Sequence, residues 1–388
     1  MTDAPITLTE HHIKVLLVDD QRMVGEAIRR MLLDIPGLEY RFHADPLTAL
    51  AVADEFGPTC ILQDLIMPGV DGIEMVRQFR TNASTSSTPL IVLSSKEEPT
   101  TKAEAFSAGA NDYLVKLPDK LELVARIRYH SAAYISRLER DEAFRALEAQ
   151  QKIIAQEIAE AAAFVRSLLP APMQEGAVTS DWRFITSSSL GGDTFGYYWL
   201  SPNQLVIYLL DVCGHGVGSA LLSVSAINTI RQRTLPNTDF NTPSQVLAGL
   251  NRLFPMEEQG GKYFTMFYGV YNTETRELIH ASGGHPPAIA IAPDGSATNL
   301  SSTGFMIGGF SLSTYRDVRT TLAPGTRLFV FSDGCYEITN PEDVMMSLSQ
   351  FSQILAASNG LDDVVSATQN WQNRPDFEDD FSLVEFKL

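Results

Sequence analysis

Short apolar runs separated by amphipathic stretches fill the first third of the chain. These runs lie at residues 14–19, 40–44, 60–64, 89–95 and 112–116, with helical periodicity between them. Continuous apolar runs of this length are typical of strands buried on both faces, as in a parallel sheet covered by helices. The pattern from Ile13 to about Arg128 therefore predicts a doubly wound, flavodoxin-like α/β domain, which we place at residues 12–131.

The amino-acid composition changes at residues 132–169. This segment contains neither Gly nor Pro and is rich in strong helix formers. Positions spaced alternately by three and four form a seam: Phe144, Leu147, Gln151, Ile154, Ile158, Ala161, Val165 and Leu168. Upstream of Phe144 the apolar seam ends, because the same spacing places the charged residues Arg140 and Arg137 on it. The pattern predicts a helical linker that forms a coiled coil in a homodimer, with the single polar Gln151 fixing the register. The alternative is an amphipathic helix packed on its own domain.

Residues 170–388 have a β-rich texture after Pro170 and Pro172 end the helix. We expect strands at 182–190, 204–212, 263–272, 276–283, 287–293 and 326–333, and helices at Gly218–Arg233 and Pro243–Phe254. Sequential antiparallel strands with segregated helices indicate an α+β domain of two packed sheets with helices outside.

Charge and composition narrow the class of protein. The net charge of −18 and the lack of a basic stripe argue against nucleic-acid binding. An odd number of cysteines (Cys60, Cys213 and Cys335) without a CxxC pair fits reduced thiols. The polar N-terminus predicts no signal peptide, and the lack of a run of about 18 apolar residues predicts no membrane span. We therefore expect a cytoplasmic protein.

Carboxylates stand at the predicted strand ends of the first domain. Asp19 and Asp20 end the first strand, Asp64 the third, Ser94 the fourth and Lys116 the fifth. In a doubly wound sheet these ends meet in one crevice. Clustered carboxylates hold a hard cation such as Mg²⁺, and one of them can accept a phosphoryl group while the cation and a lysine neutralise its charge. Taken singly, each Asp is more often a turn former.

The motifs VDD, QDLIMPGVDG, VLSS and AGANDYLVKLP together resemble the response-regulator receiver family over about 115 residues. The resemblance implies phosphorylation of Asp64 by a sensor histidine kinase or phosphotransfer protein. It further implies that Asp19, Asp20 and Asp64 bind Mg²⁺, that Lys116 pairs with the phosphate, and that Ser94 and Tyr113 form the switch pair. One departure is Leu117, which separates Lys116 from Pro118.

Four acidic motifs stand out in the C-terminal half: LGGDTFGYYWL, LLDVCGHGVGSALLS, VFSDGCYEITN and FEDDFSLVEF. Their carboxylates are Asp193, Asp211, Asp333, Asp379 and Asp380. Each motif lies beside an apolar run, where a strand meets a loop. The oxygen-rich set favours Mn²⁺ or Mg²⁺ over zinc, and two such ions can activate a shared water toward a phosphate. The alternative for any one of them is a surface or turn carboxylate.

This set resembles the bacterial sporulation and stress-regulator branch of the metal-dependent 2C-type protein phosphatases, from about Phe164 to Leu388. The resemblance implies that Asp211 is the catalytic carboxylate bridging two ions. It also implies that the Val212 carbonyl, Asp193, Asp333 and Asp379 are ligands, with Asp380 the less certain member of its pair. The SGGHPPA segment (282–288) also matches, mainly as a structural element.

Three features of this half depart from a simple family match. Gly196 stands where many members carry an Asp, which predicts a weaker secondary metal contact. The arginine and general-acid histidine of eukaryotic relatives cannot be mapped, so His215 is a candidate acid, with a loop-structuring role as the alternative. GGDTF is close to a diguanylate-cyclase signature, but Thr194 replaces its acidic residue and the other motifs belong to different chemistry.

These observations predict a response regulator in which Asp64 phosphorylation controls a phosphoserine/phosphothreonine protein phosphatase. The resemblance implies a phosphorylated anti-sigma-factor antagonist as substrate, in a partner-switching pathway. Some similar fusions have lost catalysis and act as adaptors that bind a sigma factor or its regulator. Retention of the acidic residues in all four motifs favours the enzyme here. A DNA-binding response regulator is disfavoured by the charge.

Overall fold

The computed structural model describes residues 11–388. The chain divides into two compact units, Met1–Lys152 and Ile153–Leu388. Most of the polar N-terminal segment on which the signal-peptide prediction depends lies outside the described residues. Within the described part of the chain, no helix is both long enough and apolar enough to cross a membrane.

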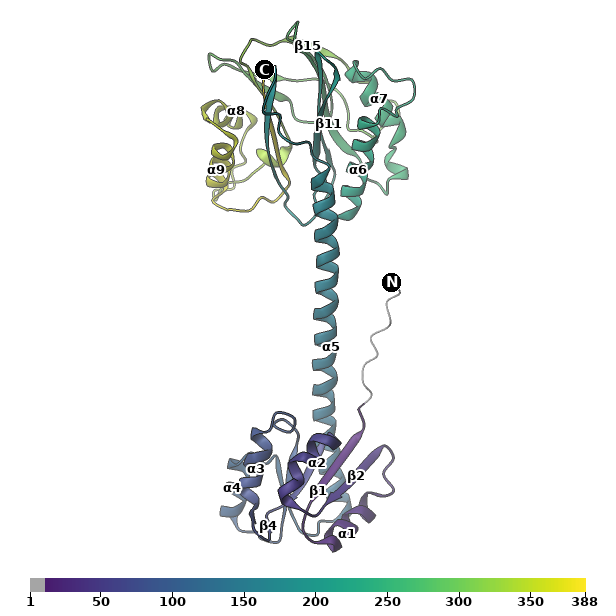
Figure 1. Ribbon diagram of the computed structural model, residues 1–388, viewed down its shortest axis with the longest axis vertical. Helices are drawn as coiled ribbons and strands as arrows, with labels where there is room; N and C mark the ends of the chain where they lie inside the picture. The colour runs from purple at the N-terminus through teal and green to yellow at the C-terminus, as the bar shows by residue number, and fades with distance from the viewer. Residues whose placement is uncertain (1–10) are drawn as a thin grey trace. The chain divides into compact units, whose positions relative to one another are not determined.

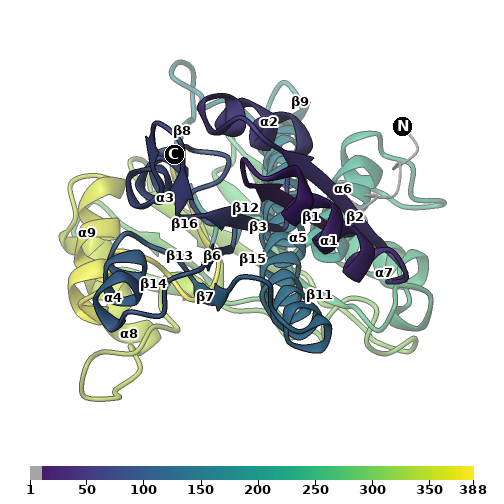
Figure 2. The same ribbon diagram turned by 90° about the horizontal axis from the view of Figure 1, so that it is seen from below.

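The first unit contains a parallel sheet in the strand order β2-β1-β3-β6-β7, which can be followed in Figure 2. Its strands are β1 (Ile13–Val18), β2 (Leu38–His43), β3 (Cys60–Asp64), β6 (Leu90–Ser94) and β7 (Asp112–Val115). A small antiparallel pair, β4 (Ile66–Met67) and β5 (Val70–Asp71), follows β3. The five apolar runs in the sequence are these five parallel strands.

Helices cover both faces of this sheet. Helices α2 (Ala49–Phe56), α3 (Gly72–Thr81) and α4 (Pro99–Ser107) pack on the face that carries Leu16 and Val92. Helix α1 (Arg22–Leu32) and the start of α5 pack on the face that carries Leu17 and Leu62. A 3₁₀ turn at Pro46–Thr48 precedes α2. Both layers are apolar, which confirms the predicted doubly wound arrangement.

Helix α5 (Lys120–Ser167) is one unbroken helix of 48 residues, as Figure 1 shows. The sequence pattern had suggested that a linker helix begins at residue 132. The structure instead continues the last helix of the first unit directly into that segment. Leu123, Ile127 and Ser131 are its buried residues. The predicted seam beyond them is exposed or half-buried, with Phe144, Leu147 and Ile154 exposed.

The second unit contains two antiparallel sheets, ordered β15-β12-β11-β10-β9 and β14-β13-β16-β17-β8. The strands are β8 (Thr179–Ile185), β9 (Thr194–Ser201), β10 (Gln204–Val212), β11 (Phe264–Asn272), β12 (Glu277–Gly283), β13 (Ala288–Ile291), β14 (Ala297–Leu300), β15 (Val318–Thr321), β16 (Arg327–Phe331) and β17 (Phe381–Lys387). All six predicted strands are present. The first ends earlier than expected, at Ile185, and β9, β14, β15 and β17 were not predicted.

The sheets pack face to face, with helices outside. Phe195, Leu209 and Phe267 of one sheet meet Val330 and Phe386 of the other in a common core. Helices α6 (Val217–Arg231) and α7 (Pro243–Leu253) cover the outer face of the first sheet. Helices α8 (Leu348–Ala357) and α9 (Leu361–Gln372) cover the outer face of the second. Short 3₁₀ turns lie at Met256–Glu258 and Asp333–Cys335. This arrangement confirms the predicted two-sheet α+β architecture.

Candidate functional site

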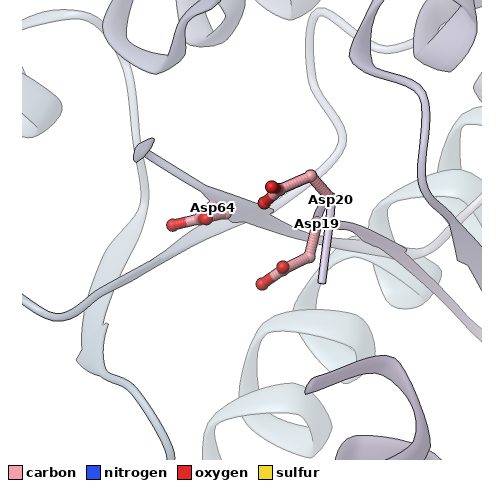
Figure 3. A group of neighbouring side chains, drawn as sticks. All are labelled: Asp19, Asp20 and Asp64. Atoms are coloured by element: carbon pink, nitrogen blue, oxygen red, sulfur yellow. The ribbon is translucent and has the colours of Figure 1, made fainter. Parts of the chain in front are cut away.

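The first unit gathers three carboxylates at the C-terminal edge of its sheet. Asp19 and Asp20 follow β1, and Asp64 ends the neighbouring strand β3. Each offers an oxygen atom, and these atoms all lie within 4.8 Å of one another. Figure 3 shows the three side chains extending toward a common region. Parallel pairing of β1 with β3 brings together residues that are about 45 positions apart in the sequence.

Lys116 provides positive charge beside this acidic group. Its Nζ lies 2.7 Å from an oxygen of Asp19 and 2.7 Å from an oxygen of Asp64. Burial raises the pKa of Asp19, although the contact with Lys116 partly opposes that effect. Burial alone would lower the pKa of Lys116, but its bonds to Asp19 and Asp64 raise it overall. The single positive charge of Lys116 does not balance the three carboxylates, so the group can still bind a cation.

Ser94 and Tyr113 meet at the backbone of one loop residue, Lys96. The Lys96 N–H donates to Ser94 Oγ at 3.2 Å, and Tyr113 Oη donates to the Lys96 carbonyl at 2.6 Å. Both side chains are buried. The two predicted switch residues therefore contact the N–H and the carbonyl of the same loop residue.

The second unit brings Asp193 and Asp211 together by strand register. Asp211 lies near the end of β10, and Asp193 immediately precedes β9, where Thr194 pairs with Leu210. The neighbouring residues Phe195 and Leu209 face the core between the sheets. Because side chains alternate along a strand, both carboxylates face the same inter-sheet layer.

The other sheet contributes three acidic residues where its paired strands β16 and β17 end and begin. Asp333 follows β16, and Asp379 and Asp380 precede β17, with Phe331 paired to Leu383. Asp379 is exposed, whereas Asp380 is 4% exposed. The four motifs, spread over almost 190 residues of sequence, therefore present their carboxylates from paired strand ends.

The carboxylates of the second site raise one another's pKa values, in addition to the effect of burial. Burial raises the pKa of Asp211 to about 7, with further upward contributions from Asp333 and Asp379. Burial, followed by the charge of Asp379, raises the pKa of Asp333 to about 6. Burial and Asp211 raise the pKa of Asp193 well above its usual range. Carboxylates at such positions repel one another until a cation joins them.

The donor set fits hard divalent ions. One carboxylate oxygen of Asp193 is buried without a hydrogen-bond partner in the described part of the chain. Within residues 11–388 the only group of three ligand atoms that all lie within 4.8 Å of one another is the Asp19, Asp20 and Asp64 group. The carboxylates of the second site therefore lie farther apart than those of the first.

Close backbone approach explains the glycines of the GGD motif. A Cβ on Gly192 would lie 2.5 Å from the Val212 carbonyl oxygen, so only glycine fits beside it. The Val212 carbonyl therefore lies against the residue that precedes Asp193. A Cβ on Gly191 would likewise collide with the carboxylate of Asp380.

Asp380 holds the loop that carries Asp193. Its carboxylate accepts hydrogen bonds from the N–H groups of Ser187 at 2.9 Å and Gly192 at 2.8 Å, and from Ser187 Oγ at 3.2 Å. These contacts satisfy the buried charge with backbone donors. Adjacent carboxylates thus have different environments, since Asp379 is exposed at the site and Asp380 is enclosed by the loop. The sequence pattern alone could not separate them.

Three other positions noted in the sequence lie in different environments. His215 is exposed on the loop after β10. His285 is buried, donates from Nδ1 to the Pro286 carbonyl at 3.0 Å, and has a pKa lowered by burial to about 4. The Tyr208 side chain of the neighbouring strand β10 occupies the space beside Gly196, because a Cβ on Gly196 would lie 2.2 Å from Tyr208 Oη. An Asp at residue 196 would therefore collide with the Tyr208 hydroxyl.

Thr265 was not singled out from the sequence. It pairs directly with Asp211 across β10 and β11, and its Oγ1 is buried without a hydrogen-bond partner among the described residues. Directly opposed residues of an antiparallel pair have neighbouring side chains on the same face. A period-2 pattern places Thr265 on a strand, but only the register shows that it faces Asp211.

Comparison with known proteins relates each half to a family. The model of the response regulator receiver domain matches residues 15–128, and that of stage II sporulation protein E (SpoIIE) matches residues 201–388. The phosphoserine phosphatase RsbP of Bacillus subtilis (strain 168) is 29% identical over 178 residues, 45% of this chain. The chain spans 43% of that protein's length.

Two further similarities cover more of the chain. The Regulator of RpoS of Escherichia coli (strain K12) is 28% identical over 283 residues, covering 70% of this chain and 81% of that protein. The solved SiaA-PP2C domain of Pseudomonas aeruginosa has a TM-score of 0.54 at 21% identity, covering 62% of this chain and 99% of that domain. The structural similarity supports the fold of the second unit.

The contrast between Asp379 and Asp380 gives a matched pair of variants. Asp380→Asn removes a buried charge that accepts four hydrogen bonds, one of them from the Asp193 N–H, so we expect it to lower the free energy of unfolding of the second unit by about 2–4 kcal/mol. Asp379→Asn, at an exposed position, should leave metal-free stability within about 0.5 kcal/mol of wild type. It should, however, weaken Mn²⁺ binding. Urea unfolding in chelator and Mn²⁺ calorimetry measure the two effects. Equal destabilisation by both variants would contradict this division of roles.

Proposed function

Because the chain joins a response regulator receiver domain to a SpoIIE-type PP2C serine phosphatase domain, we propose that phosphorylation of Asp64 controls hydrolysis of a phosphorylated serine or threonine on a partner protein. The observation that carries this proposal is the convergence of Asp193, Asp211, Asp333 and Asp379 at the paired strand ends of two sheets. We propose a phosphorylated anti-sigma-factor antagonist, in a partner-switching pathway, as the substrate.

At the second site, two Mn²⁺ or Mg²⁺ ions would be held by Asp193, Asp211, Asp333, Asp379 and the Val212 carbonyl, with Asp211 bridging. Bound ions of this kind supply a water of lowered pKa and neutralise phosphoryl charge. In the hydrolysis, the water oxygen bonds to phosphorus as the phosphorus–oxygen bond to the serine or threonine breaks. The proton lost by the water balances the proton gained by the leaving oxygen.

The residues of the chain prepare this reaction by position. Asp380 fixes the loop that carries Asp193, and Gly192 admits the Val212 carbonyl. Burial and mutual repulsion keep the pKa values of Asp211 and Asp333 raised in the metal-free protein. A cation bound beside Asp211 and Asp333 would relieve this repulsion between the carboxylates. At the first site, Asp19, Asp20 and Asp64 would hold one Mg²⁺, with Lys116 beside the phosphoryl group and Ser94 and Tyr113 as the switch pair.

The central test is Mn²⁺-dependent phosphate release from a phosphoserine peptide by wild type and by Asp211→Asn. We expect the variant to lose about 100-fold or more in rate, because Asp211 is the proposed bridging ligand. Asp294→Asn is the matched control, since Asp294 is an exposed carboxylate in a turn between strands, and its rate should equal that of wild type.

A wild-type protein that releases no phosphate, with or without a phosphoryl mimic on the receiver, would contradict the enzyme. It would favour the second candidate, a non-catalytic adaptor that binds a sigma factor or its regulator. The similarity to the Regulator of RpoS across both domains is the observation in favour of that candidate. Pull-downs with a sigma factor and with its antagonist would then separate the two kinds of partner.

Control by the receiver is proposed to act through α5, which begins against the sheet of the first unit and ends at Ser167 in the second. Beryllofluoride with Mg²⁺ mimics the phosphoryl group on Asp64. We expect it to raise the phosphatase rate and to change amide exchange along α5, while Asp64→Asn shows neither response. Unchanged rates together with unchanged exchange in the wild type would refute this coupling.

We also propose that the seam of α5 pairs with a second copy of the chain. Phe144, Leu147 and Ile154 are 59%, 53% and 48% exposed, which leaves an apolar line uncovered in one chain. Light scattering should give the mass of two chains for the wild type and of one chain for Ile154→Glu. Ile153→Glu is the control, because Ile153 is 59% exposed but lies outside the seam. Two-chain mass in both variants would exclude this interface.

A further inference from the structure

A cavity of about 220 Å³ opens beside the exposed part of the second site. It is lined by Asp333 and Asp379, two of the proposed metal ligands, and by Glu337, Gln372, Arg374 and Glu378 among others. The volume is equal to roughly seven water molecules, enough for a phosphoryl group and the carbon that carries it. A group in this cavity would contact both carboxylate ligands and one guanidinium.

The segment that carries Arg374 is held firmly against the end of α9. Gln372, which is 6% exposed, donates from its amide to the carbonyls of Arg374 at 3.1 Å and Asp376 at 2.8 Å. Gln369 donates to the Pro375 carbonyl at 2.7 Å, and the Arg374 N–H donates to the Gln369 carbonyl at 3.2 Å. The backbone from the end of α9 to Asp376 is thus held by hydrogen bonds, while the Arg374 side chain lines the cavity.

The guanidinium of Arg374 is available to an incoming anion. Its ion-pair partner is Glu378, and the two side chains are 62% and 81% exposed. Exposed pairs of this kind contribute only about 0.2–1 kcal/mol. Arg374 is the only Lys or Arg among the residues that line this cavity. A guanidinium binds a phosphate through two parallel charge-assisted hydrogen bonds, so a phosphoryl group in the cavity can compete with the exposed pair to Glu378.

We propose that Arg374 leaves Glu378 and binds the phosphoryl group of the phosphoserine or phosphothreonine substrate in this cavity. Arg374 is then a substrate-binding residue that holds the phosphoryl oxygens beside Asp333 and Asp379. Glu378 competes with the substrate for the guanidinium and so weakens binding. This inference rests on the proposed phosphatase function, but it concerns anion binding, which can be measured without turnover.

The test compares Arg374→Gln, Arg374→Lys and Glu378→Gln with wild type, all loaded with Mn²⁺. Affinity for inorganic phosphate is measured by calorimetry, and KM and kcat are measured with a phosphoserine peptide. We expect Arg374→Gln to weaken phosphate binding and raise KM about tenfold or more, the loss of a charged hydrogen bond. Arg374→Lys should restore part of the affinity.

Glu378→Gln is the matched variant, because it breaks the same ion pair from the other side. It should strengthen phosphate binding and lower KM, since the guanidinium no longer has a competing carboxylate. If Arg374 served only to hold Glu378, both variants would have the same effect, and that result would overturn the proposal. Unchanged phosphate affinity in Arg374→Gln would overturn it as well. Phosphate binding that depends on Arg374 in a protein without turnover would support this inference and contradict the proposed function.

Discussion

Repulsion between carboxylates at strand ends is the constraint around which both halves of this protein are arranged. In the first unit Asp19, Asp20 and Asp64 share one sheet edge, and Lys116 is held between two of them. In the second unit Asp211 acquires a pKa of about 7 because burial and its acidic neighbours oppose ionisation. Carboxylates gathered in this way favour a cation over the empty site.

The surrounding structure gives the buried carboxylates of the second unit different hydrogen-bond partners. Asp380 is buried, but the N–H groups of Ser187 and Gly192 satisfy its charge, so it functions as a part of the framework. Asp193, on the loop that Asp380 holds, keeps one oxygen buried without a hydrogen bond among the described residues. The rigid position of Asp193 therefore depends on a neighbour more than 180 residues later in the chain.

Helix α5 runs from the first unit into the second, and very few of its side chains are buried. Beyond Ser131 none of its residues is buried, and its stability there depends on helix-forming residues and on any partner that covers the seam. The exposed ion pair of Arg374 and Glu378 is also weak, which allows one partner to exchange.

The sequence by itself determined the class of each half. Strand ends bearing Asp64, Asp211 and Asp333 could be predicted because apolar runs and acidic motifs are local patterns. The doubly wound sheet and the pair of packed sheets followed from the same periodicity. Strands β14 and β15 escaped prediction, because each has only four residues, too few to show an alternating pattern. The start of α5 was also missed, since one helix crosses the change in composition at residue 132.

Only the tertiary structure decided what each neighbouring residue does. The distinct environments of Asp379 and Asp380, the pairing of Thr265 with Asp211, and the Tyr208 hydroxyl beside Gly196 all depend on strand register. The place of Arg374 depends on how Gln372 fixes the end of α9. Register and packing join residues far apart in the sequence, and no local pattern records those contacts. Chemistry carried by a motif is therefore readable from the sequence, while the geometry that sets burial, charge and access is not.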